Sequence, residues 1–202
     1  MPLIAELIGV KAFARERHRL DTGCQPRSAT VDTKQEPGLS LDGFDLLDGC
    51  HRQIIFKLGV LAALISRLRS RGADAEAREM AKRISHFFST TARLHHEDEE
   101  RHVFPKLVAT ADPGLVQDVR RLQQDHAWLE ANWIELGAML DAVGAGSAWN
   151  DLDALEHAAK LFTELTRDHV ALEESCIYPE ARARMHATER REMGREMAAR
   201  RR

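Results

Sequence analysis

Residues 95–105 read HHEDEERHVFP, and residues 169–179 read HVALEESCIYP. Aligned on the final proline, both stretches contain a histidine, three further residues, a Glu-Glu pair, two residues, an aliphatic residue, an aromatic residue and proline. A further histidine precedes each copy: His51 lies 44 residues before His95, and His126 lies 43 residues before His169. The chain is therefore interpreted as a tandem repeat of helix pairs.

The spacing inside each copy predicts a shared metal site. Residues four apart on an α-helix lie one turn above each other on the same face, so the histidine and the first glutamate of each copy can both point inward. A histidine from the preceding helix faces each pair. The candidate metal ligands are His51, His95, Glu99, His126, His169 and Glu173. Imidazole with carboxylate suits iron, and also zinc or manganese.

The twofold arrangement favours two ions over one. Each half offers two histidines, and a carboxylate from each half can bridge both ions. Buried carboxylates are costly without compensation, and metal ions remove that cost. Open coordination positions would remain for a small ligand.

The register of the motif has one competitor, since His96 and Glu100 are also four residues apart. The repeat favours the first register, because Val170 stands where a counterpart of His96 would be needed. We therefore expect His96 beside the site or at the surface. Glu100 and Glu174 are expected to lie beside the site or to pair with basic residues.

Other residues near the motif are candidates for supporting roles. Asp48 and Asp125 come shortly before two of the histidines, and either could accept a hydrogen bond from an imidazole. His102 and Cys176 occupy equivalent positions in the two copies and are expected to pack below the site.

The remaining sequence predicts an all-α fold. Ala, Leu, Glu and Arg are abundant, and aromatic residues make up 5% of the chain. Helices are expected over about 42–72, 74–109, 112–142 and 151–179, with Pro105 kinking or breaking the second. Four long helices with short connections favour an antiparallel up-down-up-down four-helix bundle.

Three regions are expected along the chain. Residues 1–41 form an N-terminal extension, with a short amphipathic helix and then a linker rich in small polar residues, proline and glycine. Residues 42–183 form the bundle, and residues 184–202 form a C-terminal helical tail. The arginines of the tail are expected to decorate a solvated helix end: Arg190, Arg191, Arg195, Arg200, Arg201 and Arg202.

Composition excludes several classes of protein. The net charge of −3 argues against a nucleic-acid-binding domain, and no apolar run reaches the roughly 20 residues of a membrane span. Cys24, Cys50 and Cys176 are too few and too widely spaced for a disulfide framework or a Cys-x-x-Cys zinc pattern. A soluble cytoplasmic protein is expected, either monomeric or homodimeric.

The paired motifs resemble the HHE cation-binding domain of the hemerythrin-like superfamily over residues 42–183. The resemblance implies a non-haem di-iron centre with an oxo or hydroxo bridge and an open position for O2, NO or peroxide. It implies that Glu99 and Glu173 bridge the irons. The terminal ligands would be His51, His95, His126 and His169.

Two departures separate this sequence from the oxygen carriers of that superfamily. Glu130 stands where the carriers have a second histidine on the third helix, and Glu173 follows His169 by four residues where they have an aspartate at five. Both resemble a six-ligand branch that includes iron-centre repair proteins, although Cys24 alone replaces the cysteine pair usual there. Ligand binding or sensing is therefore the first hypothesis. Iron donation for repair, NO or peroxide reduction, and metal storage or interaction are alternatives, so whether the protein is an enzyme stays open.

Overall fold

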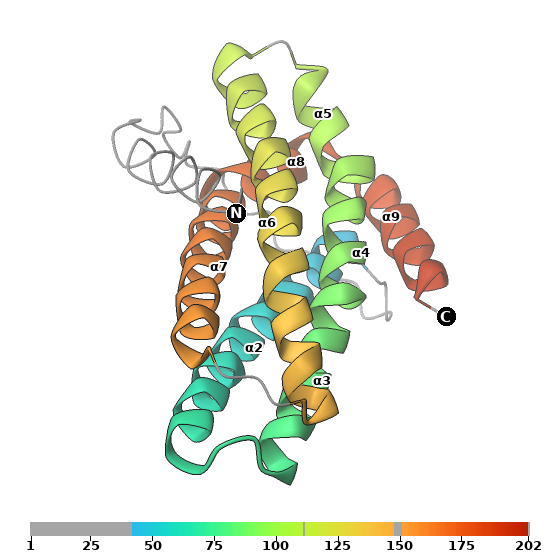
Figure 1. Ribbon diagram of the computed structural model, residues 1–202. Coiled ribbons are helices and arrows are strands. Elements are labelled where there is room, and N and C mark those ends of the chain that lie inside the picture. The colour runs from blue at the N-terminus through green and yellow to red at the C-terminus, as the bar shows by residue number, and fades with distance from the viewer. Residues whose placement is uncertain (1–41, 111, 148–150, 202) are drawn as a thin grey trace.

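The computed structural model describes residues 42–110, 112–147 and 151–201, and their regular secondary structure is entirely helical (Figure 1). The all-α prediction is confirmed. The amphipathic helix and linker expected before residue 42 lie outside the described residues. No helix within the described ranges is both long and apolar enough to cross a membrane.

The first described helix, α2, spans Gly43–Arg71. The Asp42 side chain accepts a hydrogen bond from the Phe44 N–H and so satisfies one of the unpaired donors of the first turn. The helix ends at Gly72, where φ is +70° and the N–H donates to the Leu68 carbonyl. These limits agree with the prediction.

The second helical segment is interrupted at Thr90 and again by a π-helical turn. Its parts are α3 (Ala75–Ser89), α4 (Thr91–Asp98), the π-helical turn η1 (Glu99–Val103) and α5 (Phe104–Val108). The interruption predicted at Pro105 takes the form of η1, in which the Phe104 N–H donates to the Glu99 carbonyl. Proline has no N–H for the α-helical ladder, and a wider turn accommodates the change. The break at Thr90 was not predicted.

The second half repeats this construction. Helix α6 spans Pro113–Ala145, three residues beyond the predicted end, is capped by the Asp112 carboxylate and is terminated by Gly146 in the left-handed conformation. Helix α7 (Leu152–Leu172) leads into a second π-helical turn, η2 (Glu173–Ile177), and then α8 (Tyr178–Arg184). Both glutamates of the predicted site therefore begin a π-helical turn.

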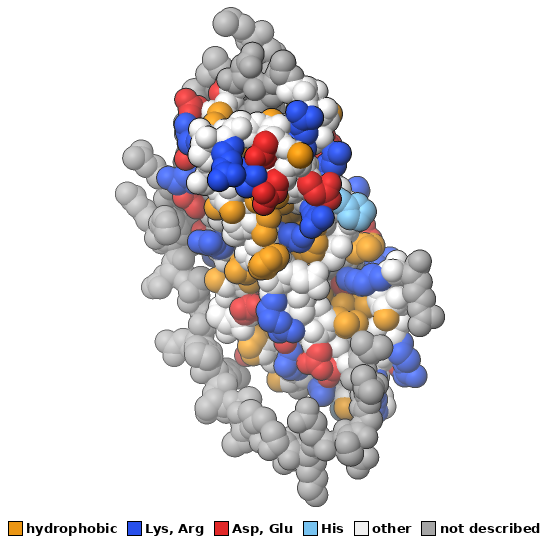
Figure 2. Space-filling model, turned by 90° about the horizontal axis from the view of Figure 1, so that it is seen from below, with side chains coloured by type: hydrophobic (Ala, Val, Ile, Leu, Met, Phe, Trp, Pro, Cys, Tyr) orange, Lys and Arg blue, Asp and Glu red, His pale blue; other side chains and the backbone are white. Residues whose placement is uncertain are grey.

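Helices α2, α3, α6 and α7 pack in a closed ring, each against two of the others (Figure 1). Buried apolar residues fall into two clusters, one around Leu58, Leu136 and Leu140 and the other around Phe44, Phe104 and Leu107. The buried histidines and glutamates lie between the two clusters along the bundle. On the described part of the end face in Figure 2, basic and acidic side chains intermingle.

Helix α9 (Ala187–Arg200) packs along α2 beside α4 (Figure 1). Arg200 and Arg201 both bind the carboxylate of Asp98, which has no exposed surface. Arg190 pairs with Asp42. For Arg190, Arg200 and Arg201 the expectation of a merely solvated helix end is therefore wrong, because a buried carboxylate requires cationic partners. Arg191 and Arg195 are exposed as expected, and Arg202 lies outside the described residues.

We predict that Asp98→Ala destabilises the protein through loss of this ion-pair cluster. Breaking a buried ion pair costs about 3–5 kcal/mol, and partial exposure of the two arginines reduces the expected loss to about 2 kcal/mol. Urea unfolding followed by circular dichroism measures it. Arg191→Ala, at an exposed position of α9, is the control. Equal losses in both variants would contradict the assigned role of Asp98.

Candidate metal centre

The six predicted ligands meet in the centre of the bundle. Their ligand atoms form two groups, each with all atoms within 4.8 Å of one another. One group contains His51, His95, Glu99 and Glu173, and the other contains His126, His169, Glu99 and Glu173. Both glutamates and His95 have no exposed surface, and His126 is the most exposed of the six at 10%. The glutamates are the residues that the two groups share.

Each shared carboxylate faces both groups with different oxygens. For Glu99, Oε1 lies 3.4 Å from His95 Nε2 and Oε2 lies 3.4 Å from His126 Nε2. For Glu173, Oε1 lies 3.2 Å from His169 Nε2 and Oε2 lies 3.2 Å from His51 Nε2. The contacts within one helix follow from the four-residue spacing, and the others come from helix packing. This is the geometry that a carboxylate bridging two cations requires.

The second glutamate of each pair lies outside the cluster and binds a histidine. Glu174 Oε1 is 3.0 Å from His51 Nδ1, and Glu100 Oε1 is 3.0 Å from His126 Nδ1. A carboxylate that accepts the Nδ1–H of an imidazole fixes the tautomer with Nε2 free to bind a metal. Each Glu-Glu pair therefore supplies one inward carboxylate and one outward carboxylate that orients an imidazole.

The two aspartates singled out from the sequence behave differently. Asp48 pairs with Arg182 and not with His51, because it points away from the bundle axis toward α8. Asp125 is buried, and its Oδ2 lies 4.0 Å from His169 Nδ1. Of the positions below the site, Cys176 is buried as expected, whereas His102 binds Glu196 of α9.

Sequence reasoning missed Tyr178. Its buried hydroxyl donates a hydrogen bond to Glu99 Oε1 and lies 3.2 Å from His51 Nε2. The ring stacks on His51, with centroids 5.1 Å apart and 7° between the planes. One signal was available: the aromatic position of the motif holds Phe104 in one copy and tyrosine in the other.

His96 is part of the centre's wall and not a surface residue. Its ring stacks on His126 at a centroid distance of 4.2 Å and an angle of 16°, and it meets His169 edge-on at 5.5 Å. Burial, followed by the neighbouring histidines, lowers the pKa of His96 well below its ordinary value. The imidazole is therefore neutral near pH 7.

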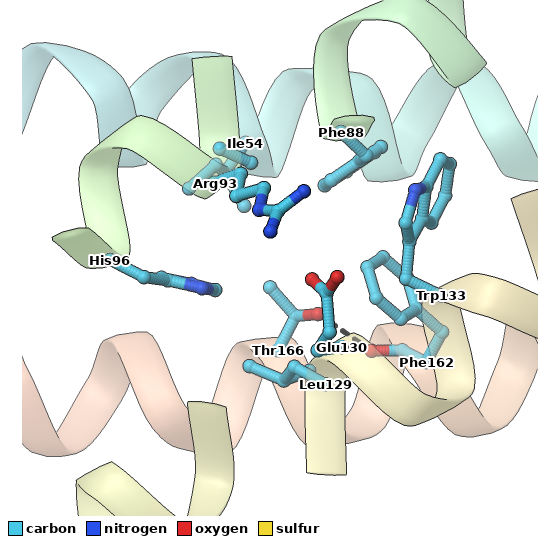
Figure 3. Close-up of a pocket in the computed structure, with 10 residues that line it drawn as sticks. Ile54, Phe88, Arg93, His96, Leu129, Glu130, Trp133, Phe162 and Thr166 are labelled. Carbon is cyan, nitrogen blue, oxygen red and sulfur yellow. Dashed lines mark hydrogen bonds between the residues drawn. The ribbon is translucent and has the colours of Figure 1, made fainter. Parts of the chain in front are cut away.

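A small cavity lies one helical turn beyond the histidines. Ile54 and Leu129 are three residues after a histidine, and Ala92 and Thr166 are three residues before one. All four line the cavity, and Figure 3 shows Ile54, Leu129 and Thr166 among the side chains around it. Two of these side chains are small, and the cavity that they line has a volume of about 30 Å³.

Aromatic rings close the far side of this cavity. The rings of Phe88, Trp133 and Phe162 lie within 5.1–5.4 Å of one another. At the near side, the Arg93 guanidinium and the Glu130 carboxylate face each other across the space (Figure 3). The cavity is thus apolar inside and charged at its edge.

An open cleft reaches the centre from outside, between α4–η1 and α6. It shares His96, Arg93 and Glu130 with the apolar cavity, and His126 lies in its wall. The half of the centre that contains His126 is therefore the half with access to solvent.

Several buried polar atoms of the centre have no hydrogen-bond partner within the described residues. Such atoms include Nε2 of His95, His126 and His169 and both carboxylate oxygens of Glu173. Leaving several buried polar groups unpaired in one place is costly, and a cation at each group would bind these atoms. The donor set of imidazole and carboxylate fits iron, zinc or manganese.

Burial and the surrounding charges shift the pKa values of the histidines in opposite directions. Burial lowers the pKa of His51 and His126, but hydrogen bonds and charges from the surrounding glutamates outweigh it and raise these values to about 9 and about 10. For His95, burial dominates and lowers the pKa to about 3. Without metal, protons on two imidazoles therefore balance the carboxylates.

The fold and the site define a helical protein with a buried cation-binding centre. A model of the Hemerythrin HHE cation binding domain matches residues 42–181, and the chain belongs to this family. The chain is also similar to an uncharacterized protein of Haemophilus influenzae. The two are 30% identical over 157 residues, which cover 78% of this chain and 88% of that protein.

We predict that alkaline pH destabilises the metal-free protein. The pKa values of His51 and His126 in the folded chain are about 9 and about 10, above the value of about 6.5 for an unfolded chain. Their stabilising contribution is complete below about pH 6.5 and is lost as pH rises through about 9 to 10. The free energy of unfolding from urea titrations should therefore fall between about pH 7 and pH 10.

The matched control for this titration is His157→Gln, at an exposed position of α7, which should leave the pH dependence unchanged. His51→Gln should flatten it. A metal-free protein whose stability rises over this pH range would show that the two imidazoles are not held protonated by the glutamates.

Proposed function

We propose that the protein binds two non-haem iron ions and uses them to bind or sense a small ligand such as O2, NO or peroxide. The observation that carries the two-ion centre is the pair of overlapping ligand groups joined by Glu99 and Glu173. His51 and His95 would hold one ion, and His126 and His169 would hold the other. Iron supplies redox chemistry and open coordination positions; zinc or manganese would fit the same donors.

The surroundings of the centre favour a small ligand. The cavity next to the four histidines is lined mainly by apolar side chains, which suits a diatomic molecule better than a charged metabolite. Neutral His96 lies between this cavity and the cleft and can donate one N–H to a molecule held there. The residues thus provide a path, an apolar holding space and a hydrogen-bond donor beside the second ion.

The open cleft also favours a second candidate function, release of iron to a recipient. His126 lies in the cleft wall, and Glu100, which orients it, is 38% exposed. Loss of the His126–Glu100 pair at the cleft would open the second ion to solvent. Iron transfer to a metal-free acceptor protein, measured against a low-affinity chelator, would separate this role from ligand binding.

We predict that Glu99→Ala and Glu173→Ala lose most bound iron, because each removes a donor from both ions. Glu100→Ala removes only the partner of His126, so it should retain about two irons per chain and weaken affinity by about 10–100-fold. Metal analysis after anaerobic loading with Fe(II) measures both effects. Glu135→Ala, at an exposed position of α6, is the control. Equal iron loss in Glu100→Ala and Glu99→Ala would contradict the proposed bridges.

We predict that Ala92→Leu slows NO binding without removing iron. The larger side chain fills the cavity one turn from His95, and access through a filled cavity should be at least about ten-fold slower. Stopped-flow absorption of the diferrous protein measures the rate. Ala131→Leu adds the same atoms at an exposed position of α6 and should leave the rate unchanged. An unchanged rate in Ala92→Leu would show that the ligand does not use this cavity.

A further inference from the structure

Tyr178 occupies a place in the centre that the six-ligand arrangement does not explain. It is the first residue of α8, directly after η2, and is 3% exposed. Its hydroxyl contacts His51 Nε2 and Oε1 of the shared Glu99, the oxygen that faces the His51–His95 group. No donor of the His126–His169 group other than the shared Glu99 has a hydrogen bond to it among the described residues.

The distances fit membership of one coordination sphere. Donor atoms bound to one ion at about 2.1 Å and at right angles lie about 3 Å apart. The Tyr178 oxygen lies 3.2 Å from His51 Nε2 and closer still to Glu99 Oε1. Glu173 Oε2 is likewise 3.2 Å from His51 Nε2. The phenol oxygen is therefore as close to the neighbouring donors as the candidate ligands are to each other.

We propose that Tyr178 is a metal ligand, through its phenolate oxygen, of the ion held by His51 and His95. This inference rests on the two-ion centre proposed above. When a ferric ion binds, the phenol O–H bond breaks, an oxygen–iron bond forms and the proton leaves to solvent, with no electron transferred. Tyrosine oxygen is a ligand that proteins use for ferric iron.

The pseudo-equivalent residue shows why only one half has this ligand. The Phe104 ring faces His126 at 5.5 Å and 22°, much as Tyr178 faces His51, but it carries no hydroxyl. The ion of the first half would thus have a fifth protein donor. The ion of the second half would not, and it is the one beside the open cleft.

The test uses the full-length chain loaded anaerobically with Fe(II) and then oxidised in air. Because the chain contains a single tyrosine, ring-deuterated tyrosine labels Tyr178 alone. We expect a visible phenolate-to-iron charge-transfer band whose resonance Raman ring modes shift on labelling. Tyr178→Phe should lose this band. Phe44→Leu, which alters the ring packed edge-on against Tyr178 but keeps the hydroxyl, should retain it.

The labelled wild-type protein decides the matter even if Tyr178→Phe does not fold. Iron bound at about two ions per chain without label-sensitive ring modes would overturn this inference and leave the two-ion centre standing. Failure of the wild-type chain to bind iron would overturn both proposals. A band that persists in Tyr178→Phe would also overturn the assignment.

Discussion

Two carboxylates without exposed surface, Glu99 and Glu173, are the constraint on which the rest of the structure depends. Each lies between two apolar clusters, where an unpaired charge would be prohibitive. Among the described residues, their close polar partners are imidazoles and one phenol from the surrounding helices. Each of the four long helical segments must therefore place one histidine at the same height along the bundle axis. The helix starts, breaks and lengths matter chiefly because they fix that height.

The π-helical turns are part of how that height is fixed. Both begin at the buried glutamate, and both end where the N–H of the aromatic residue binds the glutamate's own carbonyl. The proline that follows cannot donate a hydrogen bond, so the wider turn replaces the regular ladder there. The same turn places Phe104 against His126 and Tyr178 against His51, each a histidine of the other copy of the repeat. The last four residues of each motif, HVFP and CIYP, therefore help to position the site, as the histidine and the glutamates of the motif do.

Much of the fold and the centre could be predicted because their signals are local and doubled. Asp42 and Asp112 as caps, Gly72 as a terminator and the four-residue spacing of His95 and Glu99 all act within one or two turns. The break at Thr90, the pairing of Asp48 with Arg182 and the binding of Asp98 by the C-terminal arginines could not. These features depend on which helices become neighbours in the fold, and the periodicity of apolar residues in the sequence does not specify those neighbours. The role of Tyr178 was hidden for the same reason, since its partners come from α2 and η1.

The duplication makes the two halves alike in their histidines and glutamates, so differences between the halves must come from other residues. All these differences leave the His126–His169 side of the centre the more accessible one. Helix α9 packs beside the His51–His95 side of the centre, and Tyr178 adds a hydroxyl to that side. The His126–His169 side has Phe104 in that place and borders the cleft and the cavity through His96 and Glu130. Solvent therefore reaches the His126 side of the centre first. Under the proposed function, the His51 side would hold the centre together and the His126 side would meet the ligand, a division of roles that a symmetric pair could not provide.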